Sequence, residues 1–174
     1  MAPSTRIRSL EKFGDREIAG LSDVLIDCVE GGASVSFMLP MTCEKAVAFW
    51  RGMAESVARG ERIVLAAEDA NGIVGTVQVI LAQPENQPHR GDIAKMLVHR
   101  RARRQGTGAA LLVAAERSAR DAGKTLLVLD TASGDAERVY ERGGWLRCGQ
   151  IPDYALWPGG GLCATTFYYK SLLG

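Results

Sequence analysis

The stretch RRARRQGTGAALL, residues 100–112, constrains this chain more than any other part of the sequence. Its four arginines lie within five positions and are followed by Gly106, Gly108 and an apolar run. Apolar residues and their spacing predict a strand over residues 92–98, before the stretch, and a helix over residues 106–122. The first N–H groups of a helix have no intrahelical acceptor, and the helix dipole favours a negative group beside them. The turn therefore predicts an anion site, where the two glycines let the backbone approach closely.

Three uses of this positive charge are open: a nucleic-acid patch, a phosphate cradle and an ordinary solvated turn. The net charge of the chain is only +1, which argues against a dedicated nucleic-acid binder. A hydrophobic content of 47% and a charged content of 24% are typical of a globular protein with a substantial core. The length of 174 residues favours one domain, so residues 1–174 are expected to fold as a single unit.

Cysteine and histidine usage gives no sign of a metal site or of a disulfide framework. The four cysteines are scattered, without a C-x-x-C pair, and the two histidines form no zinc-ligand spacing. No apolar run approaches the ~20 residues that a membrane-spanning helix needs, and residues 1–14 lack the apolar core of a signal peptide. We therefore expect a cytoplasmic protein with reduced thiols, no metal and no membrane partner.

Apolar periodicity and turn signals predict elements in the order β-α-α-β-β-β-α-β-α-β-β. The expected strands are residues 5–10, 63–68, 73–81, 92–98, 125–131, 145–151 and 164–170. The expected helices run from Asp15 to the glycines at 31 and 32, from an N-cap at Thr42 to Gly60, over residues 106–122 and over residues 135–142. Residues 125–131 are almost wholly apolar, as in a strand buried on both faces. The predicted fold class is α/β or α+β, with a mixed central sheet of about seven strands and helices on both faces.

Two common phosphate-binding loops do not fit the basic turn. A P-loop ends in Gly-Lys followed by Ser or Thr, which is missing here, and a Rossmann fingerprint needs a third glycine where Leu111 stands. The remaining pattern, Arg103-x-x-Gly106-x-Gly108, resembles the coenzyme A pyrophosphate loop of the GNAT N-acetyltransferases, (Gln or Arg)-x-x-Gly-x-(Gly or Ala). Its place, after the fourth strand and at the start of the third helix, is also that of the family.

A second match follows at the spacing of the same family. Ala136-x-x-x-Tyr140, with Gly144-Trp145 after it, resembles the family's Ala-x-x-x-Tyr-x-x-x-Gly-Phe segment. A further likeness to the tabtoxin-resistance-protein branch of the family covers nearly the whole chain. It lies in residues 31–38, 89–98, 129–131 and 165–170.

A few positions depart from the family pattern. Ser133 stands where many members have an Asn that contacts the cofactor, which leaves that contact in doubt. His99-Arg100 replaces a common Val-x-Pro, and Arg104 replaces a frequent Gly, so both changes add positive charge. Trp145 in place of Phe is a mild change.

The resemblance implies how acetyl-CoA would be held. Strands four and five would splay to admit the pantetheine arm, and backbone groups at the end of strand four would bond its amides and polarise the thioester carbonyl. Arginine side chains of the turn would add charge-assisted contacts to the diphosphate. The assigned cofactor-binding residues are Met96, Leu97, Val98, Arg103, Arg104, Gln105, Gly106, Thr107, Gly108, Ala109, Ser133 and Tyr140.

The family catalyses direct attack of an amine on the acetyl thioester, and the resemblance implies the same chemistry here. An alkylamine with a pKa near ~10.4 is almost wholly protonated at pH 7, and removing that proton costs about 4–5 kcal/mol. A base or a water chain is therefore needed, and the acidic candidates are Asp92 and Asp130, which can also hold the substrate ammonium. Tyr140 is the candidate general acid for the leaving thiolate. The scattered cysteines and two histidines form no nucleophilic triad, which argues against an acyl-enzyme.

Each of these residues also has a purely structural interpretation. Asp92 can be a solvated acid at the start of a strand, and Tyr140 can be a helix residue packed against the sheet. Phe37, in the loop of residues 31–38, and Tyr154, in the last loop between strands, can form the wall of the acceptor site or pack in the core.

The sequence favours an acetyl-CoA-dependent N-acetyltransferase that acts on the amine of a small molecule, such as a toxin or an amino-acid-like compound. The alternative is a non-catalytic acyl-CoA sensor, which would keep the basic turn and could lose Asp92, Asp130 and Tyr140. No nucleic-acid partner is expected. The strand of residues 164–170 can serve in sheet packing or in a dimer seam, so homodimerisation stays open.

Overall fold

The structure, a computed structural model, describes residues 5–174 of the chain. Its strands are β1 (Arg6–Ser9), β2 (Arg62–Asp69), β3 (Gly72–Ile80), β4 (Arg90–Val98), β5 (Leu126–Thr131), β6 (Leu146–Leu156) and β7 (Leu162–Ser171). Its helices are α1 (Asp15–Glu30), α2 (Cys43–Ala58), α3 (Thr107–Asp121) and α4 (Gly134–Arg142), with a short 3-10 turn, η1, over Arg100–Ala102. The predicted order of strands and helices is confirmed.

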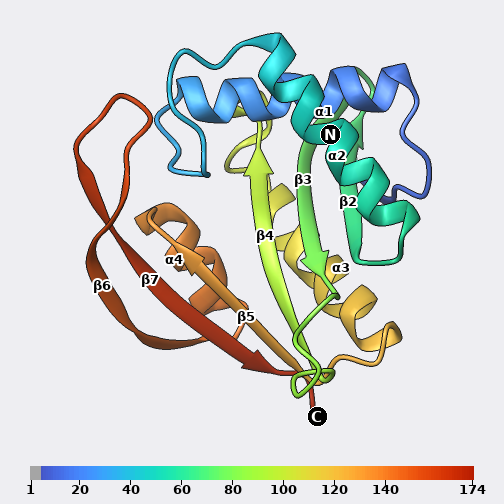
Figure 1. Ribbon diagram of the computed structural model, residues 1–174, viewed down its shortest axis with the longest axis vertical. Coiled ribbons are helices and arrows are strands. Elements are labelled where there is room, and N and C mark those ends of the chain that lie inside the picture. Colours follow the sequence, from blue (N-terminus) through green and yellow to red (C-terminus); the bar gives the residue numbers. More distant parts are fainter. Residues whose placement is uncertain (1–4) are drawn as a thin grey trace.

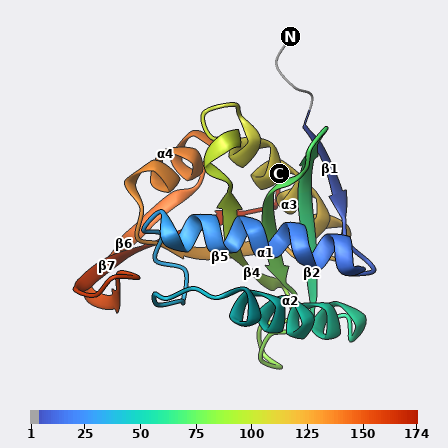
Figure 2. The same cartoon turned by 90° about the horizontal axis from the view of Figure 1, so that it is seen from above.

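A mixed seven-stranded sheet carries these elements in the order β1-β2-β3-β4-β5-β7-β6. Neighbouring strands are antiparallel except β4 and β5, which run parallel near the middle of the sheet (Figure 1). Seen from above, α1 and α2 lie on one face of the sheet, and α3 and α4 lie on the other (Figure 2). We call these the α1–α2 face and the α3–α4 face. The predicted α/β fold, with a mixed sheet between two helical layers, is confirmed.

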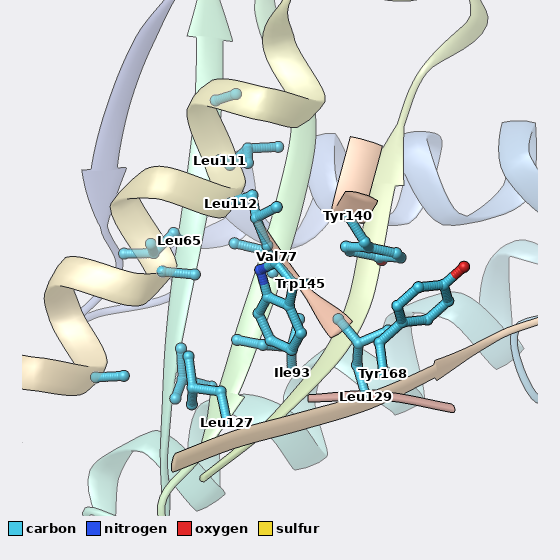
Figure 3. Packing of buried hydrophobic residues seen from close by; sticks show 14 of the residues in the cluster. Leu65, Val77, Ile93, Leu111, Leu112, Leu127, Leu129, Tyr140, Trp145 and Tyr168 are labelled. Carbon is cyan, nitrogen blue, oxygen red and sulfur yellow. The ribbon is translucent and has the colours of Figure 1, made fainter. Parts of the chain in front are cut away.

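Each face of the sheet has its own hydrophobic core. On the α3–α4 face, Leu111 and Leu112 of α3 pack against apolar strand residues and Trp145 (Figure 3). On the α1–α2 face, Leu21 of α1 and Trp50 of α2 are fully buried. Because truncation of such a side chain to Ala typically costs about 2–5 kcal/mol, these two cores hold the helices to the sheet and fix the position of the strands between them.

Strands β4 and β5 pair over only three positions and then separate. Their last paired residues are Asp92 and Val128, although β4 continues to Val98 and β5 to Thr131. The two strands start together near the C-terminus of the chain and diverge along their length (Figure 1). We call the diverging segments, residues 93–98 and 129–131, the fork. The splay that the sequence resemblance implied is therefore present.

The structure corrects two details of the expected strands. Strand β5 is not buried on both faces, because Leu127 and Leu129 are buried whereas Asp130 is exposed on the face that lines the fork. Strand β6 is longer than expected, so Tyr154 lies within it and not in the loop before β7. Pairing of Ala155 with Cys163 extends the hairpin to its tip, which the sequence did not indicate.

The predicted helix caps agree with the observed ones where the sequence was specific. Thr42 precedes α2, and its side-chain oxygen accepts a hydrogen bond from the backbone N–H of Lys45 at 3.2 Å. Within residues 5–174, no helix combines the length and apolarity needed to cross a membrane. Over the same range, no group of three or more His, Cys, Asp or Glu side chains is placed to hold a metal ion.

Candidate active site

The two candidate acids lie at the fork but in different surroundings. Asp92 is the last residue of β4 that pairs with β5, and Asp130 lies two residues beyond that pair on β5. The Asp92 carboxylate forms an ion pair with Arg90 and accepts a hydrogen bond from the Gln83 amide at 3.2 Å. Its charge is therefore already balanced within the protein.

Asp130 has no cationic partner in the described part of the chain. One of its carboxylate oxygens accepts a hydrogen bond from the Thr165 hydroxyl at 2.8 Å, and the side chain is exposed. Its cross-strand neighbour on β7 is Phe167, whose ring packs edge-on against Tyr154 with centroids 5.9 Å apart. Asp130 is thus the free carboxylate of the fork, beside an aromatic wall that includes the predicted residue Tyr154.

A β-bulge in β4 changes which face of the sheet its side chains point to at the fork. Thr76 of β3 pairs with Leu97, but Gln78, two residues on, pairs with Ala94, so Lys95 and Met96 together oppose one residue of β3. Ile93 consequently packs in the core of the α3–α4 face and Leu97 in that of the α1–α2 face, although regular alternation would send both to one face. The backbone of Lys95 has a positive φ of 49°. The bulge therefore re-aims side chains where the two strands separate.

Lys95 faces the α1–α2 side of the fork as a consequence. Its ammonium donates a hydrogen bond to the Ser36 hydroxyl at 3.1 Å and lies 5.9 Å from the centre of the Phe49 ring. Burial lowers the pKa of Lys95, the charge of Asp130 opposes that shift, and Arg62 adds to it. Lys95 and Asp130 therefore influence each other from opposite arms of the fork.

The loop before α2 closes over this side of the fork. Phe37 packs edge-on against Phe49 at a centroid distance of 5.2 Å, which places this predicted substrate-site residue beside Lys95. The Ser34 hydroxyl donates to the Leu156 carbonyl at 3.2 Å, so the loop is also tied to the β6–β7 hairpin. Phe37 and Tyr154 belong to separate aromatic pairs and do not form one continuous wall.

Tyr140 lies on the opposite side of the fork, on the α3–α4 face. Its ring is buried beside Trp145 and Tyr168, with centroid distances of 5.9 and 6.0 Å (Figure 3). Burial raises the pKa of Tyr140, and the negative charge of Asp130 adds to the rise. Among residues 5–174, the Tyr140 hydroxyl has no hydrogen-bond partner. Tyr140 is thus both a packed core residue and a neutral phenol that senses Asp130.

The first two arginines of the basic turn are engaged inside the protein. The Arg100 backbone N–H and guanidinium donate to Asp27 of α1 at 2.8 and 2.7 Å. Burial raises the pKa of Asp27, but the hydrogen bonds from Arg100 outweigh it, so the net shift is downward. Arg101 forms an ion pair with Asp69 at the end of β2. These arginines anchor the turn to α1 and to the β2–β3 hairpin.

The second pair of arginines faces the start of α3. The Arg103 guanidinium donates to the Val98 carbonyl at 3.0 Å, so it braces the end of β4. Arg104 is exposed, has a left-handed backbone with φ of 59°, and has no ion-pair partner in the described residues. It follows that Arg104 is the arginine whose charge is uncommitted.

The glycines at the start of α3 leave the backbone open to a ligand. Gly106 adopts φ of 81° before the first residue of the helix, and no side chain caps this N-terminus. A side chain added at Gly106 would meet no atom within 4 Å, and one at Gly108 would meet only a Val98 methyl at 3.9 Å. The first turn contains no acidic residue. The backbone N–H groups at this helix start are therefore open to the approach of an anion.

The remaining predicted cofactor residues have mixed settings. Gln105 and Thr107 bond the backbone of η1 and Ala109 follows in the first turn of α3, so these residues shape the turn. Ser133 is exposed and caps α4, accepting from the Ala136 N–H at 3.5 Å. The predicted pantetheine-binding residues of β4 are the last three of the strand, at the open end of the fork: Met96, Leu97 and Val98.

Sequence reasoning missed three residues that the structure brings to the fork. Lys95 stood within an apolar strand and Phe49 within the apolar side of a helix, and Ser36 stood in a loop. Only the lysine carried a signal, because a charged residue in the middle of a buried strand is unusual.

Two shallow hollows, of about 590 and 390 Å³, lie elsewhere, between β1 and α3 and between α1 and α2. The candidate site is therefore defined by strand divergence and by the charges that flank it.

Comparison with known proteins identifies the family of the chain and relatives of its fold. Residues 36–145 match a protein family described as the acetyltransferase (GNAT) family. The fold is similar to ribosomal-protein-alanine N-acetyltransferase from Brucella melitensis, at 21% identity and a TM-score of 0.77, over 95% of this chain and 99% of that one. It is also similar to yncA of Salmonella typhimurium, described as an acetyltransferase with its cofactor acetyl-CoA, at 18% identity and a TM-score of 0.74, over 98% and 95% of the two chains. Aminoglycoside 6'-acetyltransferase type Ii gives 19% identity and a TM-score of 0.71, over 97% and 98%.

Proposed function

Because the chain belongs to the acetyltransferase (GNAT) family, we propose that it transfers an acetyl group from acetyl-CoA to the amine of a small molecule. The observation that carries the proposal is the course of β4, which parts from β5 at Asp92 and runs directly into the glycine turn before α3. A strand gap and an open helix N-terminus at its end are the two features that a long, diphosphate-bearing acyl donor requires. The proposal takes residues 1–174 as one acetyltransferase domain.

The glycine turn would hold the diphosphate of the donor. Backbone N–H groups from Gly106 to Ala109 supply donors that no side chain of residues 5–174 caps, and Arg104 supplies a positive charge without an ion-pair partner in that range. Backbone groups of Met96 to Val98 would bond the pantetheine arm along the fork. When bound, acetyl-CoA supplies an acetyl group that is activated as a thioester.

Asp130 would hold the amine of the acceptor. Its carboxylate lacks a cationic partner, whereas that of Asp92 is neutralised by Arg90, so an ammonium group gains more from Asp130. From there the carboxylate, directly or through one water, can take the proton that the amine must lose. Asp92 lies where β4 and β5 part and would have a smaller role, because Arg90 already neutralises its charge.

Tyr140 would supply the proton that the departing sulfur needs. A phenol is protonated at neutral pH, as a proton donor must be, but burial and the charge of Asp130 raise the pKa of Tyr140, so it would release the proton only as negative charge develops on the sulfur beside it. Its place on the face opposite Asp130 separates the donor of one proton from the acceptor of the other. A small-molecule acceptor would approach on the α1–α2 side of the fork, where Phe37 and Tyr154 contribute to two separate aromatic pairs.

Finer assignments belong to the same proposal. The sequence likeness to the tabtoxin-resistance-protein branch supports a toxin or amino-acid-like acceptor. The four cysteines are free thiols in the structure, which supports a cytoplasmic protein. Strand β6 is an exposed edge, so homodimerisation stays open.

The experiment is thiol release from acetyl-CoA, measured with a panel of amines. Asp130→Asn is expected to lower kcat/KM by about 10²-fold or more, Tyr140→Phe by about 10²-fold, and Asp92→Asn by less than about tenfold. Tyr168→Phe is the control for Tyr140, because it removes a neighbouring phenol that instead bonds Glu141. CoA affinity should be unchanged in the Asp130→Asn, Asp92→Asn and Tyr168→Phe variants. If acetyl-CoA binds but no amine accelerates thiol release, the protein is an acyl-CoA sensor and the enzymatic proposal is wrong.

A further inference from the structure

Lys95 presents a positive charge to the acceptor side of the fork without an acidic partner. The contacts of its ammonium among the described residues are neutral: the Ser36 hydroxyl at 3.1 Å and the face of Phe49 at 5.9 Å. The charge of Asp130 acts on the Lys95 pKa, yet the two groups form no ion pair within residues 5–174. A partly buried ammonium without a counter-ion is costly, and an anionic ligand group would relieve that cost.

The orientation of this lysine is fixed by the backbone. The bulge places Lys95 and Met96 opposite one residue of β3, which brings the lysine to the α1–α2 face. Without the bulge, alternation from Ile93 would direct Lys95 into the core of the α3–α4 face. The strained φ of 49° at Lys95 is the local cost of this arrangement.

The charges on the two arms of the fork have opposite sign, and neither forms an ion pair with any described residue. Asp130 on β5 suits a cation, and Lys95 on β4 suits an anion. Arg62 adds positive potential near Lys95. An acceptor with only an amine would be attracted to Asp130 and repelled by Lys95, whereas a zwitterion would be attracted to both.

We propose that Lys95 binds a carboxylate of the acceptor, so that the substrate class is an amino acid or a compound that carries both an amine and a carboxylate. Lys95 is then a specificity-determining residue, and the Ser36 hydroxyl positions its ammonium. Phe37 and Phe49 cover the apolar part of such a substrate beside the carboxylate. The inference rests on the proposed acetyltransferase activity and adds the charge pattern of its acceptor.

The test uses matched acceptors that differ only in the carboxylate. Each amino acid is compared with its carboxamide and with its decarboxylated amine, by acetyl-CoA-dependent thiol release. The variant is Lys95→Met, which keeps the apolar stem and removes the charge. The control is Lys12→Met, which removes one positive charge from an exposed site between β1 and α1 at the far edge of the sheet.

The wild type and Lys12→Met should prefer the carboxylate form by about tenfold or more in kcat/KM. Lys95→Met should lose most of that preference through a higher KM for the carboxylate form, while the neutral analogues change by less than about threefold. CoA affinity should be the same in all three proteins, which reports that Lys95→Met is folded.

Two results would overturn the inference while leaving the acetyltransferase intact. One is a wild type that acetylates amines with no preference for a carboxylate. The other is a Lys95→Met variant that loses activity equally on both members of each pair. If no amine of any class is acetylated, the proposed function fails, and this inference fails with it.

Discussion

Arg100 and Arg101 differ in their partners from Arg103 and Arg104, which lie three positions further along the same turn. The first pair forms ion pairs with Asp27 and Asp69, residues of elements that are distant in the sequence. In the second pair, Arg103 donates to the Val98 carbonyl, and Arg104 has no ion-pair partner in the described chain. Identical side chains in one turn therefore have different partners: the first pair is held by acidic residues of the protein, whereas the second pair has no acidic partner in the described chain and is the pair that we propose to face the ligand. A net charge count over the turn would have hidden this division.

The comparison can be tested first at the backbone that both pairs flank. Gly108→Val fills the open face at the start of α3 without requiring a positive φ, so CoA affinity should fall by about a hundredfold or more. Gly52→Val is the matched control, because Gly52 also lies in a helix with open space around it. Isothermal titration with CoA measures both. Equal affinity for the two variants would mean that the glycine turn does not carry the diphosphate.

The structural role of the first pair is tested next by Asp27→Asn. This change removes the charge that Arg100 neutralises and weakens buried, charge-assisted hydrogen bonds, so the free energy of unfolding should fall by about 1–2 kcal/mol. Urea denaturation measures the loss. CoA affinity should stay within about twofold of the wild type. A large fall in CoA affinity at unchanged stability would reverse the roles assigned to the two pairs.

The ligand-directed role of the second pair is tested by Arg104→Ala. An exposed arginine that contacts a diphosphate contributes about 1 kcal/mol, so the Kd for CoA should rise by about fivefold. The melting temperature without CoA should not fall, because Arg104 has no ion pair in the described structure to lose. Loss of stability without loss of affinity would contradict the comparison.

The smallest expected effect is in the pH dependence of stability. The pKa of Asp27 is lowered in the folded protein, so its contribution to stability is fully present above the ordinary pKa of about 3.8. The contribution is lost as the pH falls below that value, because the unfolded chain then binds the proton more readily. Asp27→Asn should therefore reduce the loss of stability between about pH 4 and pH 3. If Asp27→Asn loses as much stability as the wild type between these pH values, Arg100 does not stabilise the charged form of Asp27.

Much of the fold follows from sequence because its signals are local. Gly31 and Thr42 mark helix boundaries, and the residues that separate β2 from β3 form a short turn. The glycine turn was also predictable, since its strand, its basic residues and its helix are contiguous. These features depend on neighbours in the chain, which periodicity and capping rules describe.

The parts that sequence did not give depend on register and on distant partners. The Arg100–Asp27 contact spans 73 positions, so no local pattern links the two residues. Lys95 reaches the fork only because β3 and β4 slip by one residue, and no composition rule predicts that slip. Tyr154 was placed in a loop because Pro and Gly residues nearby are typical of turns, but cross-strand pairing carries β6 past it.

The central claim is that a diphosphate lies on the backbone amides around Gly106 and that its acyl arm enters the fork. Titration of ¹⁵N-labelled protein with CoA, followed by ¹H–¹⁵N correlation spectra, tests it most directly. The account predicts the largest shifts at the amides of Gly106 to Ala109 and of Met96 to Val98. Saturable binding whose shifts lie elsewhere, or no binding at all, would contradict it.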